Sequence, residues 1–238
     1  MSDELIAQGF RNKAIAVEPG VHAIAVEPKL GIGQQAYLVH TPQGNIMWDC
    51  VGLLHPQFVA EVEALGGVAA IAVSHPHFYA ACADWAEAFS AHRECKVYLH
   101  EADREWVTRP STALEFWSGE EREVWTGVNL MQLGGHFPGS SVLLWEESRD
   151  GQGVVFAGDT VFPVPGGGVS FMFSFPNLLP LPVDQVARIG RTLGRCNFDR
   201  LYGPFPQSVV KHDAAAVVRE SAARYCGLLD GSTTRRYT

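Results

Sequence analysis

Two histidines, His75 and His77, directly follow a short apolar segment in the stretch IAVSHPHFYAACADW (71–85). Two residues separated by one position in extended backbone point their side chains the same way, so both imidazoles can approach one cation. Zinc lies about 2.1 Å from a ligating imidazole nitrogen, a distance that such a pair can share. An HxH pair alone is a weak signal in a chain with nine histidines.

Two later segments supply candidate partners for this pair. His136 lies between an apolar segment and a Gly-containing turn in MQLGGHFPGSS, and Asp159 directly follows the apolar segment of GVVFAGDTVF. All four side chains thus come after the end of a predicted strand, which is where ligand sites gather in α/β sheets. The sequence therefore predicts a metal site made of His75, His77, His136 and Asp159.

Short apolar, β-branched segments alternate with segments of helical periodicity along the chain. Predicted strands cover 20–26, 35–40, 45–50, 68–74, 96–100, 129–134, 141–146, 153–158 and 199–203. Predicted helices cover 56–65, 79–92, 101–107, 183–193 and 209–228. The turn residues of HTPQGN predict a hairpin between the second and third strands. This α/β order favours helices that pack outside a strand-rich centre.

The order of these motifs resembles the metallo-β-lactamase-fold superfamily over roughly residues 20 to 205. The matching features are a strand followed by Asp49, a strand followed by His75 and His77, GGHFPGS with His136, and FAGDTVF with Asp159. The resemblance implies one domain over 1–238 with a four-layer αββα sandwich and metals at one sheet edge. It also implies a structural role for Asp49 beside the site, with no part in the chemistry.

The chain departs from the superfamily at the residues that hold a second metal. The usual string is HxHxDH, whereas Tyr79 stands here in place of the aspartate and Ala80 in place of the last histidine. Cys82 takes a position that is commonly glycine, and LYGPFPQ offers Pro204 or Phe205 where a further histidine is usual. The resemblance therefore implies one ion, a zinc held by the four predicted ligands.

The sequence also offers other ligands and is compatible with another metal. His75, His136 and Asp159 form a two-histidine, one-carboxylate set, which suits non-haem iron, although a third histidine closes one open position. Cys50 and Cys82 lie close to the ligands in the sequence pattern, but unliganded buried cysteine is more common. His212 is expected on a helix, away from the site.

These residues predict a mononuclear metal-dependent hydrolase that cleaves an ester, thioester or lactone bond of a small molecule. One zinc ion lowers the pKa of bound water to about 7 and polarises a carbonyl group. In this hypothesis Asp159 accepts the proton, and Tyr79 donates a hydrogen bond to the developing oxyanion. Two alternatives remain: a metal- or ligand-binding module without catalysis, and a non-haem iron oxygenase of the same fold.

An aromatic segment suggests an apolar part in the substrate. The Gly- and Pro-rich stretch 163–182 is expected to be a loop, and loops of this length are usually functional. Trp117, Phe171, Met172, Phe173 and Phe175 are the candidate pocket residues. The alternative is that these side chains fill gaps between the sheets and the helices.

The composition excludes several classes of protein. The 238 residues, 47% of them hydrophobic, contain no apolar run of the roughly 20 residues that a membrane span needs, and the acidic start shows no signal peptide. Five scattered cysteines without a CxxC pair predict free thiols in a reducing compartment. The net charge of −8 without a basic stripe argues against nucleic-acid binding. We expect a soluble, cytoplasmic protein that acts on a small molecule, in an oligomeric state that the sequence leaves open.

Overall fold

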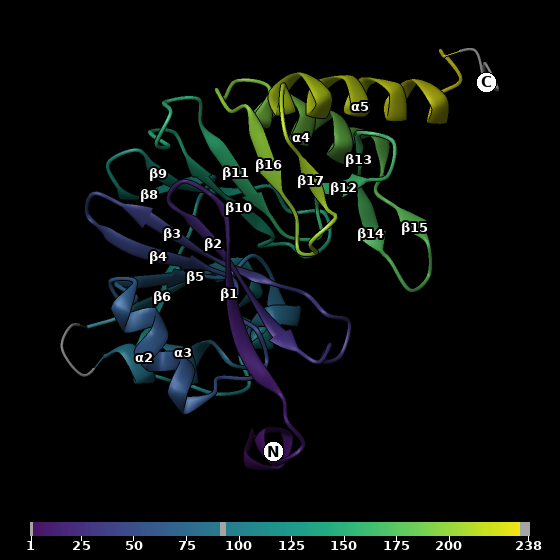
Figure 1. The fold of residues 1–238 in the computed structure, drawn as a ribbon. Coiled ribbons are helices and arrows are strands. Elements are labelled where there is room, and N and C mark those ends of the chain that lie inside the picture. The colour runs from purple at the N-terminus through teal and green to yellow at the C-terminus, as the bar shows by residue number, and fades with distance from the viewer. Residues whose placement is uncertain (1, 91–93, 234–238) are drawn as a thin grey trace.

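The computed structural model describes residues 2–90 and 94–233, and within these ranges two large mixed β-sheets lie face to face (Figure 1). The first sheet has the strand order β1 (Arg11–Glu18), β2 (Val21–Glu27), β3 (Ala36–Thr41), β4 (Gly44–Trp48), β5 (Ala70–Ala72), β6 (Lys96–His100), β7 (Leu114–Trp117). Neighbours are antiparallel from β1 to β4 and parallel from β4 to β7. The C-terminal ends of β2, β4, β5 and β6 therefore lie at one edge of this sheet.

The second sheet has the strand order β17 (Val209–Val210), β16 (Arg200–Tyr202), β11 (Val154–Ala157), β10 (Ser141–Trp145), β9 (Val128–Gln132), β8 (Glu121–Trp125). Only the β11–β16 pair is parallel among these neighbours. Two small hairpins follow β11: β12 (Phe162–Val164) with β13 (Gly168–Ser170), and β14 (Met172–Ser174) with β15 (Leu179–Pro180). They occupy most of the stretch that we predicted to be a structureless loop.

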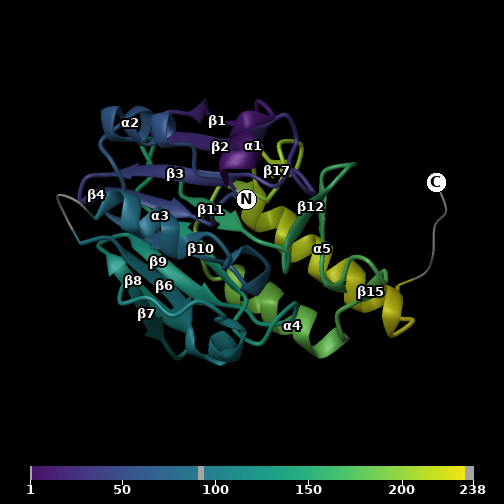
Figure 2. The same cartoon turned by 90° about the horizontal axis from the view of Figure 1, so that it is seen from below.

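Helices cover the outer face of each sheet (Figures 1 and 2). The first sheet is covered by α2 (Pro56–Ala64) and α3 (Cys82–Phe89), and the second by α4 (Val183–Leu193) and α5 (Ala214–Leu229). Shorter helical pieces are α1 (Ser2–Ala7), η1 (Pro76–Phe78) and η2 (Glu101–Trp106). The predicted four-layer αββα sandwich is confirmed.

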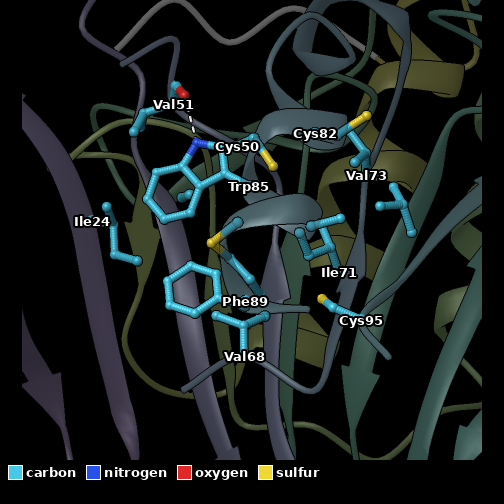
Figure 3. Packing of buried hydrophobic residues seen from close by; sticks show 14 of the residues in the cluster. Ile24, Cys50, Val51, Val68, Ile71, Val73, Cys82, Trp85, Phe89 and Cys95 are labelled. Carbon is cyan, nitrogen blue, oxygen red and sulfur yellow. Dashed lines mark hydrogen bonds between the residues drawn. The ribbon is translucent and has the colours of Figure 1, made fainter. Parts of the chain in front are cut away.

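Apolar side chains fill the three spaces between these layers. Beneath α3, the buried Trp85 and Phe89 pack beside Ile71 of β5, and the indole nitrogen of Trp85 donates to the carbonyl of Val51 at 3.1 Å (Figure 3). A second cluster lies between α4, α5 and the second sheet. A third lies between the two sheets and includes the fully buried Phe156. The period-two pattern of the strands supplies side chains to both faces of each sheet.

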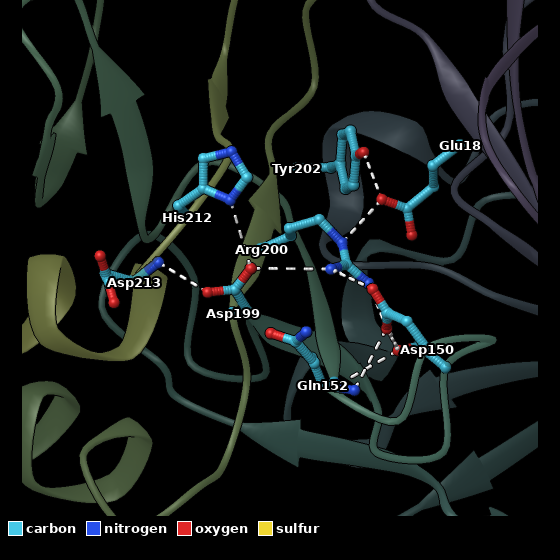
Figure 4. A network of polar contacts seen from close by, with 10 residues as sticks. Glu18, Asp150, Gln152, Asp199, Arg200, Tyr202, His212 and Asp213 are labelled. Carbon is cyan, nitrogen blue, oxygen red and sulfur yellow. Dashed lines mark hydrogen bonds and ion pairs between the residues drawn. The ribbon is translucent and has the colours of Figure 1, made fainter.

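An ion-pair network joins the two sheets at the edge opposite the C-terminal ends of β2, β4 and β5 (Figure 4). Arg200 of β16 contacts Glu18 of β1 and Asp150 of the β10–β11 turn, each at 2.8 Å. The Tyr202 hydroxyl donates to the same Glu18 carboxylate at 2.7 Å. These contacts link strands that are almost two hundred positions apart, and they fix one end of the sandwich.

Every predicted strand is present, but three predicted helices differ in the structure. The segment 79–92 begins its helix only at Cys82, after η1, and its predicted end at His92 lies outside the described residues. The segment 101–107 forms the 3₁₀ helix η2. The segment 209–228 begins with β17, and helix α5 starts only after Asp213. The φ of 55° at Asp213 is left-handed and does not fit a continuous helix.

The five cysteines are free, as predicted, and Cys50, Cys82 and Cys95 are buried. In the described part of the chain, no helix has the length and apolar character needed to cross a membrane.

Candidate metal centre

The four predicted ligands lie close together where the C-terminal ends of β5 and β11 meet at one edge of the two sheets. His75 follows β5 and His77 lies in η1, while His136 follows β9 and Asp159 follows β11. One ligand atom from each residue lies within 4.8 Å of all the others. Residues up to 84 positions apart in the sequence are thus brought to one point, because β5 of the first sheet and β11 of the second both end at this edge.

Three imidazole nitrogens face one another at the centre of this group. The Nδ1 atom of His77 lies 3.2 Å from Nε2 of His75 and 3.3 Å from Nε2 of His136. The Oδ2 atom of Asp159 lies 3.6 Å from the Nε2 atoms of both His75 and His136. His75 and His136 are buried, Asp159 is half-buried and His77 is exposed, so the group is open to solvent on the His77 side.

A hydrogen-bond relay sets the tautomer of His75. The hydroxyl of Ser74 donates to Oδ2 of the buried Asp49 at 3.0 Å, so its oxygen is left to accept from Nδ1 of His75 at 2.8 Å. With the proton assigned to Nδ1 by this network, Nε2 of His75 presents a lone pair to the centre. The backbone N–H of Ser74 also donates to Asp49, at 2.7 Å, which holds that carboxylate in place.

A backbone carbonyl does the same for His136. Nδ1 of His136 lies 2.9 Å from the carbonyl oxygen of Phe173 in β14, an acceptor that requires the proton on Nδ1. Nε2 of His136 therefore also turns a lone pair toward the centre. Histidines that bind metals usually donate their outer N–H to a carbonyl or a carboxylate relay of this kind.

This donor set fits a cation. Nδ1 of His77 can carry at most one hydrogen, which can satisfy only one of the two lone pairs that face it. The other nitrogen is then left unpaired beside a carboxylate, an arrangement that is costly in a buried site. A shared cation satisfies all three imidazoles and the carboxylate together, and three histidines with one carboxylate are a zinc-type ligand set.

Burial shapes the charges of the group. Loss of solvent lowers the pKa of His75 well below its usual value, and the nearby His136 and His77 lower it further. Burial also lowers the pKa of His77 and of His136, so the neutral form of all three rings is favoured at pH 7. Burial raises the pKa of Asp159 to about 6. Neutral imidazole is the form that binds metal, so the site is ready for a cation at neutral pH.

Two backbone features allow the relay to form. Asp49 has a φ of 61°, a left-handed conformation that aspartate tolerates better than most residues and that follows directly on β4. Gly158 lies so close to the relay that a Cβ atom there would be 2.5 Å from Oγ of Ser74 and 3.1 Å from Nδ1 of His75. A glycine is therefore required between β11 and Asp159.

Phe137, which the sequence reasoning missed, packs against all three histidines. Its ring centroid lies 5.8 Å from His75, 5.0 Å from His77 and 5.2 Å from His136. The ring of Trp106 of η2, which is half exposed, lies 5.5 Å from that of Phe137. The one signal in the sequence for Phe137 was its position directly after a predicted ligand, His136. The role of Ser74, directly before His75, was missed as well, although its position gave the same kind of signal.

Of the two residues at the second-metal positions, Tyr79 is buried and Ala80 is exposed. Tyr79 is 8% exposed and belongs to the core beneath α3, where burial raises its pKa. It lines a cavity of about 230 Å³ together with Ala80, Cys82 and Trp106. Its predicted hydrogen bond to an oxyanion stays a prediction.

Only part of the predicted aromatic pocket lies near the group. Phe175 is 6.1 Å from the His136 ring, and Phe173, 53% exposed, provides the carbonyl that His136 contacts. Trp117 and Phe171 instead lie in the hydrophobic core, 4% and 0% exposed. Trp117 packs between the two sheets, and Phe171 packs beneath α5 against Tyr225. The sequence pattern of a strand does not show which layer each of its faces meets, and for this reason these two residues were wrongly predicted to line the pocket.

The remaining candidates lie elsewhere. Met172 is half-buried in β14. Cys50 and Cys82 are in the core of the first sheet, and His212 is largely exposed beside Asp199 at 3.6 Å. Neither of these cysteines nor His212 belongs to the four-residue group found among the described residues.

Comparisons with known proteins come from sequence and from structure. No family model matches the chain. The uncharacterized protein YmaE of Bacillus subtilis (strain 168) is 42% identical over 214 residues, which are 90% of this chain and 76% of YmaE.

Solved structures of metallo-β-lactamases are similar in fold. DIM-1 is 13% identical with a TM-score of 0.66 and covers 90% of this chain and 98% of its own. FIM-1 from Pseudomonas aeruginosa, in its mono-zinc form, is 13% identical with a TM-score of 0.61 over 90% of this chain and 96% of its own. MEM-A1, a subclass B3 enzyme from a soil metagenome library, is 17% identical with a TM-score of 0.60 over 92% and 94%. At these identities the likeness concerns the fold alone.

Proposed function

We propose that this chain, which has the metallo-β-lactamase fold and belongs to the same family as YmaE, is a mononuclear metal-dependent hydrolase. The observation that carries the proposal is the convergence of three neutral imidazoles and one carboxylate, with ligand atoms within 4.8 Å of one another. The outer nitrogens of His75 and His136 already have partners, so their inner lone pairs are free for a cation. The proposed cation is zinc, in keeping with this ligand set.

One ion is proposed because the residues that would hold another are absent. Tyr79 and Ala80 stand at the aspartate and histidine positions of the second site, and Tyr79 lies in a hydrophobic core. The mono-zinc form of FIM-1 is an example of this fold with one zinc ion. A single zinc, when bound, polarises a carbonyl group and lowers the pKa of a water molecule to about 7.

The protein side chains would orient the reactants and handle the proton. His75 and His136 are held by Ser74 and by the Phe173 carbonyl, which orient their rings toward the proposed metal position. Asp159 offers a carboxylate oxygen beside the two histidines, which could accept the proton of the attacking water. Burial raises its pKa to about 6 in the metal-free protein, and this pKa would be lower with a cation bound, so the charged form would be the one present at neutral pH.

The proposed substrate is a small molecule with an ester, thioester or lactone bond and an apolar part. Phe137 and Phe175 pack against the ligand histidines, so apolar surface lies next to the reacting position. We place the enzyme in the cytoplasm, because its five free thiols suit a reducing compartment.

Metal analysis combined with a substrate panel tests the proposal. Protein purified without added metal is analysed for zinc and iron, and then assayed on nitrophenyl esters, thioesters and lactones. We expect about one zinc per chain and hydrolysis of at least one class of substrate. His136→Ala should lose both the metal and the activity, whereas His212→Ala, a largely exposed histidine outside the group, should keep both.

The same measurements separate the alternatives. Iron in place of zinc, with oxygen consumption and no hydrolysis, would point to the oxygenase. A stoichiometric metal without turnover on any substrate would point to a binding module. Equal metal content in His136→Ala and the unmodified chain would contradict the ligand assignment itself.

A further inference from the structure

A groove of about 480 Å³ lies between the loop that follows β2 and the turn that follows β16. Its walls are mainly apolar, and the side chains that matter here are Val26, Leu30, Ile32, Val51 and Phe205. Two charged residues, Glu27 and Lys29, also belong to the lining, both exposed to solvent. Neither the four metal ligands nor Trp117 and Phe171 line this groove.

The topology places this groove at the same edge as the metal centre. β2 runs parallel to β4 and β5, because β3 is antiparallel to both β2 and β4. The loop after β2 therefore emerges at the edge where His75 follows β5. On the second sheet, β16 is parallel to β11, so the turn with Phe205 emerges beside Asp159. Figure 1 shows the loop after β2 and the β16–β17 turn on the same side of the molecule.

A row of aromatic rings connects the groove with the metal centre. The ring of Phe205 lies 5.9 Å from that of Phe162, which lies 4.9 Å from that of Phe175. Phe175 in turn lies 6.1 Å from the ring of His136. Neighbouring aromatic rings thus lead from a metal ligand to the groove wall, without a charged side chain in the row.

Hydrogen bonds fix the two walls of the groove to each other. The backbone N–H of Gln35, at the end of the loop after β2, donates to the carbonyl of Pro204 at 2.9 Å. The hydroxyl of the buried Tyr37 donates to the carbonyl of Gly203 at 2.7 Å. A groove whose walls are already held together loses little conformational entropy when a ligand enters it.

Apolar side chains in this groove are open to solvent. Ile32 is 60% exposed, and Leu30 and Phe205 are half-buried. A contiguous apolar surface beside polar, site-forming groups is typical of a ligand site. A flexible apolar chain fits such a groove, because its binding removes apolar area from water without a polar group to satisfy.

We propose that this groove binds the aliphatic acyl chain of the substrate, so that the enzyme hydrolyses esters or thioesters of medium- to long-chain carboxylic acids. The proposal rests on the proposed hydrolase function and names its substrate class. In the reaction, the bond from the acyl carbon to oxygen or sulfur breaks. Water gives its hydroxyl group to the acyl carbon and a proton to the leaving alcohol or thiol.

The first test is the dependence of kcat/KM on chain length. With the metal-loaded full chain, nitrophenyl acetate, butyrate, hexanoate, octanoate and decanoate are compared. Burial of each methylene group should raise kcat/KM by about fourfold, the equivalent of about 0.8 kcal/mol, until the groove is filled. In Ile32→Asp the octanoate ester should lose about tenfold or more in kcat/KM, and the acetate ester less than about twofold. A further variant, Ile32→Trp, narrows the groove and should move the preferred ester to a shorter chain.

A matched control and a binding assay keep the groove and the chemistry apart. Leu229→Asp, at a similarly exposed leucine at the end of α5, should keep the chain-length dependence unchanged. Displacement of the fluorescent apolar probe anilinonaphthalene sulfonate by decanoate should be weakened in Ile32→Asp and unchanged in Leu229→Asp. This readout needs no turnover.

The outcomes are distinct. Ester hydrolysis that is independent of chain length and unaffected at Ile32 would overturn the acyl groove and leave the hydrolase in place. Displacement of the probe that depends on Ile32, without any hydrolysis, would support the groove and overturn the hydrolase. A dimer that Ile32→Asp converts to a monomer in light scattering would show that a second copy of the chain fills the groove, and would overturn the proposal.

Discussion

Replacement of Ser74 by alanine tests whether the relay behind His75 tunes the metal centre. The hydroxyl of Ser74 joins Asp49, at 3.0 Å, to Nδ1 of His75, at 2.8 Å. Alanine removes both contacts but keeps the backbone N–H that Asp49 accepts at 2.7 Å. The side chain is 2% exposed, so water cannot readily replace the lost oxygen. The imidazole then has no fixed partner for its outer N–H.

The size of the effect follows from the role of the lost contacts. Loss of an outer partner of a ligating histidine typically weakens metal binding by tenfold to a hundredfold. In free energy this is about 1.4–2.7 kcal/mol. The metal-free protein should also lose about 1–3 kcal/mol of stability, because the outer nitrogen of His75 becomes a buried, unsatisfied donor. The two losses have the same origin but are measured independently.

Competition with a chromogenic chelator gives the affinity for zinc, and urea unfolding of the metal-free protein gives the stability. Ser90→Ala is the matched control, because Ser90 donates one hydrogen bond to the Ala86 carbonyl at 2.6 Å at the end of α3. Because Ser90 is exposed and water can replace its hydrogen bond, this variant should keep both its affinity for zinc and its stability. Equal zinc affinities of Ser74→Ala and the unmodified chain would refute the reasoning about the relay.

Two further predictions concern the same region. In Gly158→Ala the new Cβ meets Oγ of Ser74 at 2.5 Å, so we expect a loss of about 1–3 kcal/mol in stability together with loss of bound metal. The control is Gly52→Ala, where the nearest atom lies 3.9 Å from the new Cβ. Equal metal content in the two variants would contradict the predicted clash. Burial raises the pKa of Asp49 to about 7 in the metal-free protein, so the folded state holds this proton more tightly than the unfolded state does. The stability should therefore fall as the pH rises from about 4 to about 7, by up to about 1.4 kcal/mol per pH unit, and an unchanged slope of urea-unfolding free energy against pH in Asp49→Asn would contradict this.

Much of the architecture could be predicted from local patterns. Apolar, β-branched segments marked every strand that was predicted, and the turn residues of HTPQGN marked the β3–β4 hairpin. The same patterns missed the edge strands β1, β7 and β8. They also missed the short strands after β11, where glycine and proline suggested a loop. They also extended the last helix through 209–213, because its apolar residues recur at helical spacing even where β17 forms. Short elements at sheet edges depend on pairing with distant strands, and local propensity does not report this pairing.

The sequence by itself determined which side chains were available for a metal centre: three histidines and an aspartate, each directly after a strand, with Tyr79 and Ala80 in the second-metal positions. Only the tertiary structure decided that their nitrogens and oxygen meet within 4.8 Å and that Ser74 and the Phe173 carbonyl fix the ring tautomers. It also decided that Phe171 is core and that the Ile32 groove lies at the metal edge. The physical reason is that residue types and strand ends are local properties of the chain, whereas hydrogen-bond partners and the faces that become exposed arise only when two separate sheets pack together.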